Sequence, residues 1–422
     1  MKQVLWLASW YPNKLSPYDG DFLQRHAKAV SLFCKLHVIY IVKDETGAVT
    51  KDLHTETAVN DNLTEQVIYY AAAKTGIPII DRALSQRRYV QLYKKAVTEY
   101  IEANDKPAIC HVQIALKAGL AALWIKRKWN IPYVVSEQWT GYLGNADHSV
   151  AHYSLIQKRW LGQVLKNASA ITVVSDHLGK SMQKHFPYVD YRVIPNVVDT
   201  NIFSPALGNS EAEPTFIHIS NMNYQKNTEA ILKAFSLLKN EGTYRLQLFG
   251  TASRTLIKLI GTLELTDRVM VRGEVPQTEL ALAIQRSDAL ILYSRFETFG
   301  CVLIEANACG VPVIVSDIEV FHELVREGEN GMFAKEDDPA ALAATIRDFS
   351  KAKKQFNNGT IALIVAFGLA TAAAARSHAF AAGGATTVTG WRASGVHPIP
   401  RNRLSGPPRA AGGRGLRSCS RR

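Results

Sequence analysis

Short apolar runs alternate with stretches of helical periodicity through the first half of the chain. Val4–Ser9 and Leu36–Val42 have the length of buried strands, whereas Ala83–Asn104 and Ala115–Trp129 repeat apolar residues at helical spacing. This alternation predicts a parallel sheet covered by helices on both faces. The other elements expected in this half are strands at 109–112, 133–136 and 170–175 and helices at 21–33 and 153–167.

A break in this pattern divides the chain. Residues 195–214 contain Pro195, Pro205 and the pair Gly208-Asn209, a composition typical of a linker. The alternation then restarts, so we expect an α/β protein with doubly wound domains at 1–194 and 215–350, facing each other across a cleft. In such sheets, ligands bind at the carboxyl ends of the strands. The elements expected in the second domain are strands at 215–220, 245–249, 269–271, 289–294 and 311–316 and a helix at 228–238.

The first 33 residues indicate a core strand followed by a helix. The apolar run ends at Trp10-Tyr11-Pro12 and no small-residue cleavage site follows, which argues against a signal peptide. In the helix expected at 21–33, Phe22, Ala29, Val30 and Phe33 share one face. We expect that face to pack against the sheet.

Composition and charge exclude several classes of protein. The 422 residues are 47% hydrophobic and 20% charged, which is typical of globular chains and not of disordered or coiled-coil proteins. Five cysteines without a CxxC pair argue against a disulfide framework and fit a reducing cytoplasm. The net charge of +12 divides into +8 for residues 1–194, −8 for 195–348 and +12 for 349–422. The body is therefore neutral overall, which argues against nucleic-acid binding.

Residues 351–422 form an atypical basic tail. Beyond residue 354 there are nine arginines and no lysine, and the last acidic residue is Asp348. We interpret the chain from about residue 365 as disordered or read out of frame, with a functional basic tail as the alternative. The longest apolar run, Ile361–Ala375, is shorter than the roughly 20 residues that a membrane span needs.

A second basic region lies inside the first domain. Residues 74–128 hold 11 basic and four acidic residues, on predicted helices with aromatic neighbours. Basic helical faces of this kind contact anionic membranes, or are simply solvated.

The segment at 293–306 carries the most chemistry. A buried strand is expected to end at Ser294, Glu297 lies in the following loop, and Gly300 allows close backbone approach at the start of a helix. The N-terminus of that helix suits a diphosphate. Glu305 lies about 80° around the helix from Glu297. Carboxylates at these places suit ribose and sugar hydroxyls, and two solvated glutamates in an ordinary strand–loop–helix are the alternative.

Phe296-Glu297-x-Phe299-Gly300 through Glu305-Ala306, followed by Gly310–Ile314, resembles the E-x7-E core of glycosyltransferase family 4, which has the GT-B fold. The resemblance covers residues 1 to about 350. It implies an enzyme of the retaining, bacterial cell-surface polysaccharide type. Further matching segments are Ser9–Pro12 with Gly20 and Phe22, Ile194–Asp199 with Phe203, Asp267–Val269 with Gly273, and Asn330-Gly331.

The resemblance also implies roles for individual residues. Lys226 would contact the donor phosphates, Glu297 the sugar, Glu305 the ribose, and Arg272 the region of the base. The alternatives are a solvated lysine for Lys226, an exposed strand-end arginine for Arg272 and a plain turn glycine for Gly20. The residues implied at the catalytic centre are Glu297, Lys226, Gln113 and His111. Those implied at the donor site are Gly20, Arg272, Phe299, Gly300, Val302 and Glu305.

The chain departs from the family pattern at three places. Ser220-Asn221 stands where the family has Gly-Arg, so the phosphate arginine is missing there and another cation would have to substitute for it. Gln113 takes the place of the second histidine of an HxH motif, which leaves His111 or the Glu137-Gln138-Trp139 turn as polar groups for the reacting centre. Residues 319–321 stand where the family often has two glycines ahead of the glutamate that matches Glu323.

The predicted reaction is retaining transfer from a nucleotide-sugar to a growing cell-surface glycan, of the capsule or lipopolysaccharide type, or to a lipid-linked acceptor. We expect a cytoplasmic protein, at the inner face of the membrane if the acceptor is lipid-linked. No cofactor or metal is expected. Asp19-Gly20-Asp21 matches a D-x-D metal signature, but acidic residues at this place are also favoured at the start of a helix. A nucleotide-sugar epimerase of GT-B fold and a non-catalytic basic membrane-binding protein are the alternatives.

Overall fold

The computed structural model describes residues 1–146, 148–205 and 213–363. Their strands form an eight-stranded and a six-stranded sheet, so the predicted α/β class with two mainly parallel sheets is confirmed. The first sheet lies within residues 3–193 and the second within residues 215–334.

The first sheet has the strand order β3-β4-β2-β1-β5-β6-β7-β8. All neighbouring strands are parallel except β3 (Leu53–Asn60) and β4 (Leu63–Ala71), which form an antiparallel hairpin. The hairpin was not predicted, because β3 is mostly polar and almost wholly exposed at the edge of the sheet. The remaining strands are β1 (Gln3–Ala8), β2 (Lys35–Asp44), β5 (Ile109–Gln113), β6 (Tyr133–Glu137), β7 (Ala170–Val173) and β8 (Arg192–Val193).

Helices cover both faces of this sheet, as the strand alternation requires. Leu5 and Leu7 of β1 share a core with α2 (Pro78–Ala103) and α3 (Ala115–Trp129), whereas Trp6 and Ala8 share another with α1 (Asp21–Ser31). Side chains alternate between the faces because a strand has a period of two. The other helices of this part are α4 (Leu155–Asn167) and α5 (Asp176–His185).

The buried face of α1 differs from the one expected. The helix buries Leu23 and Ala27, which lie one turn apart, and leaves Phe33 63% exposed beyond its end. The small Ala27 side chain allows a close approach to the sheet along that line, so the larger apolar residues lie beside it rather than under it.

The second sheet has the order β11-β10-β9-β12-β13-β14, and all its neighbouring strands are parallel. The interior strands β12 and β13 are buried along their whole length, which explains their continuous apolar runs. The strands are β9 (Thr215–Ile219), β10 (Arg245–Phe249), β11 (Val269–Gly273), β12 (Ala289–Leu292), β13 (Val313–Ser316) and β14 (Gly331–Ala334).

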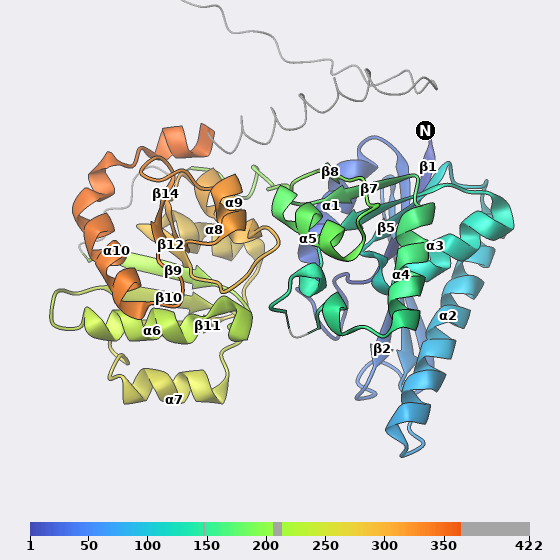
Figure 1. Cartoon of the computed structure of the whole chain (residues 1–422), viewed down its shortest axis with the longest axis horizontal. Helices are drawn as coiled ribbons and strands as arrows, with labels where there is room; N and C mark the ends of the chain where they lie inside the picture. The colour runs from blue at the N-terminus through green and yellow to red at the C-terminus, as the bar shows by residue number, and fades with distance from the viewer. Residues whose placement is uncertain (147, 206–212, 364–422) are drawn as a thin grey trace, which may run out of the picture. The chain divides into compact units, whose positions relative to one another are not determined.

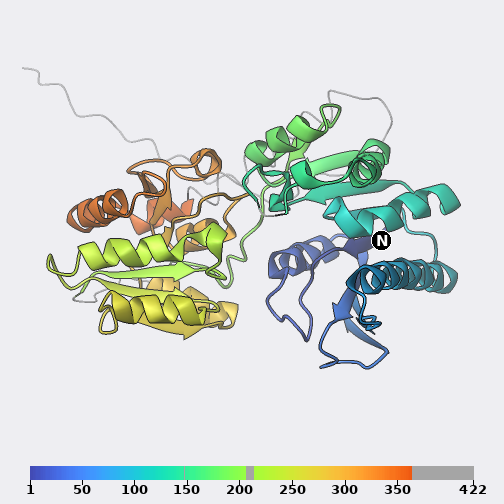
Figure 2. The same cartoon turned by 60° about the horizontal axis from the view of Figure 1, so that its bottom comes forward.

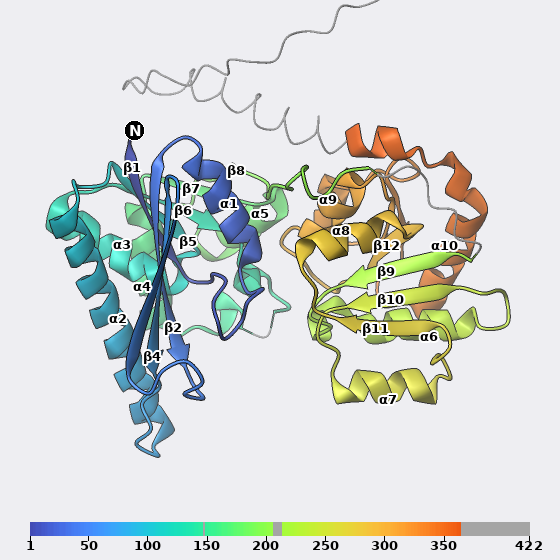
Figure 3. The ribbon, with the colours of Figure 1, turned by 180° about the vertical axis from the view of Figure 1, so that it is seen from behind.

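Helices cover both faces of this second sheet. On one face, α6 (Thr228–Leu237), α7 (Arg254–Thr262) and α10 (Pro339–Ala352) share a core with the strands, and Figure 2 shows α6 lying along them. On the other face, α8 (Gln277–Gln285) and α9 (Cys301–Ala308) share a second core. Figure 1 shows α6 and α10 toward the viewer, and Figure 3 shows α8 and α9 from behind.

Packed structure continues beyond residue 350, where the tail was expected to begin. Residues 358–363 are helical, and Phe356 and Ile361 are buried in the same core as α6 and α10. The second core therefore recruits at least the first part of the segment assigned to the tail. The disorder or frameshift expected from about residue 365 lies outside the described residues. Within those residues, no helix is both long and apolar enough to cross a membrane.

Candidate active site

Three neighbouring strands of the second sheet bring the predicted donor residues together. β9, β12 and β13 lie side by side, and the loops that follow β9 and β12 carry Lys226 and Glu297. These residues are 71 positions apart in the chain. The parallel topology places both at the carboxyl edge of the sheet, where ligands bind in doubly wound folds.

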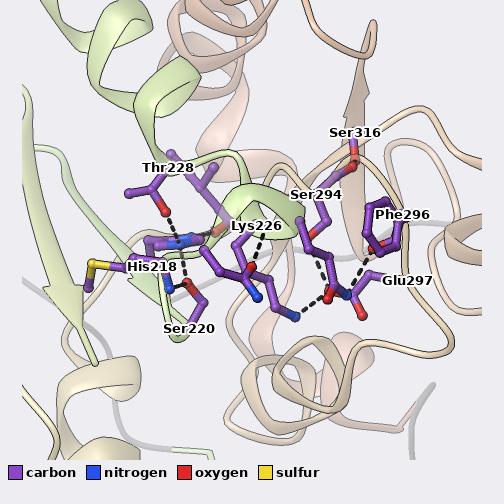
Figure 4. Close-up of polar contacts among 12 residues, drawn as sticks. His218, Ser220, Lys226, Thr228, Ser294, Phe296, Glu297 and Ser316 are labelled. Carbon is purple, nitrogen blue, oxygen red and sulfur yellow. Dashed lines mark hydrogen bonds and ion pairs between the residues drawn. The ribbon is translucent and has the colours of Figure 1, made fainter. Parts of the chain in front are cut away.

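Lys226 and Glu297 form an ion pair (Figure 4). Lys226 ends a short 3-10 turn, Tyr224–Lys226, and its backbone N–H donates to the Asn223 side chain at 3.2 Å. The Glu297 carboxylate also accepts a hydrogen bond of 3.0 Å from the Ser294 hydroxyl and is 5% exposed. The arrangement holds a cation and an anion at the edge of the sheet, both able to contact a charged, hydroxylated ligand.

Further hydrogen bonds fix the loop that carries Glu297. The Gln225 side-chain amide donates to the Phe296 carbonyl at 3.0 Å, and the Arg295 backbone N–H donates to the Gln225 carbonyl at 2.8 Å. From β13, the Ser316 hydroxyl donates to the Ser294 carbonyl at 2.6 Å. The loops after β9 and β12 are therefore held as one unit, which limits the positions available to the Lys226–Glu297 pair.

His218 is a part of this unit that the sequence analysis missed. It lies in the interior of β9, fully buried, and its Nδ1 is 2.8 Å from the Ile291 carbonyl oxygen. A carbonyl only accepts, so Nδ1 donates and Nε2 accepts from the hydroxyls of Ser220 at 2.7 Å and Thr228 at 3.2 Å. Burial lowers the pKa of His218 to about 4, so the ring is neutral. A polar residue inside the apolar run 215–219 was the available signal.

The helix expected after Gly300 is α9. Gly300 adopts the left-handed conformation with φ 95°, and an added Cβ would lie 3.1 Å from the side chains of Leu303 and Phe321. No side chain caps the helix start, so its backbone N–H groups remain available to a ligand. Phe299 is buried and Val302 is partly buried, both in hydrophobic clusters, so these two contribute packing and backbone rather than polar side chains.

Glu305 is paired with a residue that the sequence analysis did not propose. Its carboxylate is 2.5 Å from the guanidinium of Arg25 on α1, 280 residues away, and it is only 3% exposed. Burial raises the pKa of Glu305, and the Arg25 charge opposes that rise. The Arg25 Nε is buried and has no hydrogen-bond partner among the described residues. The carboxylate expected to hold ribose is thus held by an arginine in the described structure.

Gly20 lies directly before α1, in the loop that the sequence analysis expected to approach the phosphates. Its φ is 69°, and a Cβ there would lie 2.9 Å from backbone atoms of Trp10 and Tyr11. The loop therefore doubles back on the end of β1 so closely that only glycine fits.

At the first sheet, His111 and Gln113 of β5 form a local hydrogen-bond network. The Gln113 amide is 3.2 Å from Nε2 of His111, which is also 2.7 Å from the Ser136 hydroxyl. Burial lowers the pKa of His111 to about 3, so it is neutral and unsuited to donating a proton from a charged ring. His111 and Gln113 lie on β5, whereas Lys226 and Glu297 belong to the second sheet.

The Glu137-Gln138-Trp139 turn holds a buried carboxyl group. Glu137 Oε1 accepts from the Ala115 N–H at 2.8 Å and from the Tyr142 hydroxyl at 2.9 Å. Its other oxygen is buried without a partner in the described part of the chain. Burial raises the pKa of Glu137 to about 7. These contacts tie the start of α3 to the end of β6.

The remaining predicted residues make other contacts, and among them Asp21 forms an ion pair with Arg25 at 3.8 Å. Arg272 is exposed on the edge strand β11 and donates to the Gln247 side chain at 3.2 Å. Burial raises the pKa of Asp19, whereas Asp21 is the first residue of α1 and accepts from Gln277 at 2.8 Å. Among the described residues, His, Cys, Asp and Glu side chains form no group of three or more that could hold a metal.

Comparison with known families places these residues in context. One family model, described as Glycosyltransferase Family 4, matches residues 61–202, and another, described as Glycosyl transferases group 1, matches residues 199–359. The second match contains Lys226, Glu297, Gly300 and Glu305. The chain is a glycosyltransferase of the family 4 type. The family resemblance expected from the motifs is confirmed.

Curated relatives of this glycosyltransferase differ in substrate. N-acetyl-alpha-D-glucosaminyl L-malate synthase of Bacillus anthracis is 29% identical over 42% of this chain and 49% of its own length. Alpha-monoglucosyldiacylglycerol synthase of Streptococcus pneumoniae is 27% identical over 52% of this chain and 54% of its own. D-inositol 3-phosphate glycosyltransferase of Frankia alni is 26% identical over 54% and 62%. The chain therefore spans about half the length of these relatives.

Solved structures agree on the fold. Sucrose-phosphate synthase of Thermosynechococcus elongatus matches 90% of this chain and all of its own with a TM-score of 0.69 at 17% identity. HepE of Anabaena, in complex with UDP and glucose, matches 90% of this chain with a TM-score of 0.65 at 16% identity. At such identities the likeness extends to the fold alone, and it confirms the predicted GT-B architecture.

Proposed function

We propose that the protein transfers a sugar from a nucleotide-sugar donor to a glycan or lipid-linked acceptor at the cell surface, with retention of the anomeric configuration. The observation that carries the proposal is the pairing of Lys226 with Glu297 at the carboxyl edge of the second sheet, on the side of β12 where α9 begins. A cation and an uncapped helix start suit the diphosphate, and a carboxylate suits sugar hydroxyls.

In this proposal, the protein acts mainly on the leaving group. Negative charge grows on the nucleoside diphosphate as the glycosidic bond breaks, and Lys226 with the N–H groups at the start of α9 would stabilise it. Glu297 would hold sugar hydroxyls and orient the anomeric carbon. No cofactor is required by this scheme, because the diphosphate charge is met by protein groups.

Glu305 and Arg25 belong to the same proposal. Glu305 would accept hydrogen bonds from the ribose hydroxyls, with Arg25 keeping the buried carboxylate ionised. Arg25 also offers the cation that the sequence lacks at Asn221. Its buried, unpartnered Nε is available for a phosphate oxygen if the side chain moves. Gly20, Phe299, Gly300 and Val302 would shape the site through backbone and packing, and Arg272 would lie beside the base.

The acceptor side of the proposal rests on the first domain. His111 and Gln113 end β5, and a neutral histidine with a side-chain amide suits hydroxyl recognition. The protein named alpha-monoglucosyldiacylglycerol synthase among its relatives favours a lipid-linked acceptor, which would place the enzyme at the inner face of a membrane. A capsule or lipopolysaccharide glycan remains part of the same proposal.

A screen of nucleotide-sugars, with and without candidate acceptors, tests this function. We expect one donor to raise the melting temperature, and release of the nucleoside diphosphate to depend on the acceptor. NMR of the product should show the same anomeric configuration as the donor. Conversion of the donor to an isomer without any acceptor would instead identify an epimerase. No donor binding at all would favour a non-catalytic protein.

A further inference from the structure

The N-terminal turns of α2 carry large apolar side chains into solvent. Ile77, Ile79, Ile80 and Leu84 are 53%, 82%, 43% and 43% exposed, and we name these four residues the α2 tip. The first buried residue of the helix is Ser85, so none of the tip contributes to the core. Figures 1 and 3 show that this end of α2 projects beyond the neighbouring strands of the first sheet.

Two residues of the tip share one side of the helix. At about 100° per residue, Ile80 and Leu84 lie about 40° apart on the helix, on the side away from the buried Tyr89 and Tyr93. Ile77 directly precedes the helix, and Ile79 extends from its first turn. Four large apolar side chains exposed within eight residues, at a projecting end, indicate a binding surface.

Basic residues surround the tip. Between residues 72 and 98 the chain has six lysines and arginines and one acidic residue, Asp81. The Asp81 carboxylate is turned back on the loop, where it accepts from the Thr75 N–H at 2.6 Å. Within the described part of the chain, no carboxylate forms an ion pair with Lys74, Arg82 or Arg87, all of which are exposed. Arg87 lies about 20° around the helix from Ile80, so charge and apolar surface share one side.

We propose that the α2 tip inserts into the interface of an anionic lipid membrane and anchors the enzyme there. Exposed isoleucines and a leucine would enter the boundary between headgroups and acyl chains, while Lys74 and Arg87 contact the anionic headgroups. The positive charge selects this partner over a neutral apolar protein groove. The inference rests on the proposed function in one respect, since a lipid-linked acceptor needs the enzyme at a membrane.

The test is sedimentation of the full-length protein with vesicles of phosphatidylcholine, with and without phosphatidylglycerol. We expect binding only to the anionic vesicles. The variant Ile79→Ser/Ile80→Ser should lower the partition coefficient by at least about tenfold, because apolar insertion and charge act together. The matched control is Leu237→Ser/Ile257→Ser, which alters two comparably exposed apolar residues of the second domain and should leave binding unchanged.

The salt dependence of vesicle binding distinguishes binding through the α2 tip from binding through the basic residues beyond position 349. Binding by charge alone is lost at high salt, whereas an inserted apolar tip keeps part of its affinity. Lys74→Gln/Arg87→Gln should therefore reduce the salt dependence of binding without abolishing it. Equal partition of the wild type and the Ile79→Ser/Ile80→Ser variant would overturn the proposal, as would a wild type that ignores anionic vesicles.

Two further measurements separate a membrane anchor from a dimer interface and from a misfolded variant. Sedimentation equilibrium tests whether the tip joins two copies of the chain, and self-association abolished in the tip variant without vesicle binding would overturn the proposal. Calorimetry with a free nucleoside diphosphate should give equal affinity for the tip variant and the wild type, which shows that the variant is folded. Vesicle binding in a protein that binds no nucleotide would refute the proposed function and leave the membrane anchor standing.

Discussion

Lys226 and Glu297 show how strongly the loss of a single side chain can affect this protein. Glu297 is almost wholly buried, and its partners are Lys226 and the Ser294 hydroxyl. Removing one partner of a buried pair leaves an uncompensated charge, which costs far more than the loss of an exposed pair. Under the proposed function, ligand binding and stability are therefore coupled at this position, and both have to be measured.

We expect Lys226→Ala and Glu305→Gln each to weaken binding of a free nucleoside diphosphate. The loss of one charged hydrogen bond is worth about 1.5–3 kcal/mol, so the dissociation constant should rise by roughly 10- to 100-fold. Isothermal calorimetry measures the constant, and thermal unfolding identifies any variant that is merely unstable. Lys233→Ala, an exposed lysine on α6, is the control. Unchanged affinity in both variants would remove the assignment of the donor site.

His218 makes stability depend on pH. Its pKa is lowered to about 4 in the folded protein by burial, against about 6.5 in an unfolded chain. Between these values the unfolded chain binds more protons, so the free energy of unfolding falls as the pH drops from 6.5 toward 4. The stabilisation is fully present above pH 6.5, and the part lost by pH 4 is ~3 kcal/mol.

The variant His218→Gln should flatten this dependence. Denaturant unfolding at pH 7 and pH 5 gives, for each protein, the change in the free energy of unfolding on acidification. His111 and Glu137, whose contributions to this change have opposite signs, are present in both proteins, so their contributions cancel when the two proteins are compared. A variant that loses as much stability on acidification as the wild type would show that His218 is not the group responsible.

At the scale of elements, the candidate site includes two helices that each follow directly after a glycine. Gly20 precedes α1 and Gly300 precedes α9, both with left-handed backbone and without a side-chain cap. A serine or aspartate at these places would satisfy the first N–H groups of the helix itself. Glycine leaves them available and lets a ligand approach closely.

Gly20→Ala tests this role. The new Cβ would meet backbone atoms of Trp10 and Tyr11 at 2.9 Å and would need a positive φ, so we expect the protein to lose roughly 2 kcal/mol of stability. The affinity for a nucleoside diphosphate should fall with it, since the loop has to move. Gly261→Ala in α7 is the control, because nothing lies within 4 Å of its added Cβ. A Gly20→Ala protein as stable as this control would refute the close packing of the loop.

At the scale of the whole molecule, the two halves of the chain carry opposite net charge. Residues 1–194 are basic and residues 195–348 acidic by eight charges each. In the described structure, Arg25 of the basic half pairs with Glu305 of the acidic half, and Lys226 pairs with Glu297 within the acidic half. Under the proposed function, these protein cations would take the place of a divalent ion.

We therefore expect transferase activity to survive chelation. Incubation with EDTA should leave the rate of nucleoside diphosphate release within about twofold of the untreated enzyme, because the diphosphate charge would be met by Lys226 and the start of α9. The assay is run with the donor found in the screen. A loss of activity that magnesium or manganese restores would implicate Asp19 and Asp21 as metal ligands.

Local sequence pattern was sufficient to predict most elements and the strand–loop–helix segment that carries Glu297 and Gly300. Strand 245–249 and helix 115–129 were predicted with the boundaries that β10 and α3 have, because burial imposes periods of 2 and 3.6 on the sequence. The motif around 293–306 predicted Glu297, Gly300 and the helix after them. The hairpin β3–β4 escaped because its outer strand is mostly polar and barely buried, so it has no apolar period to detect.

Other features were decided only by tertiary structure. The pairing of Glu305 with Arg25 joins positions 280 residues apart, and no local pattern carries information on which helices meet. The buried face of α1 went to Leu23 and Ala27 because close packing against the sheet outweighed the size of the apolar residues. Burial depth, which makes His218 and His111 neutral, likewise depends on what the rest of the chain places over them. The sequence by itself determined most of the elements and the family resemblance, because those depend on neighbours along the chain. The partners and protonation of the site depend on neighbours in space.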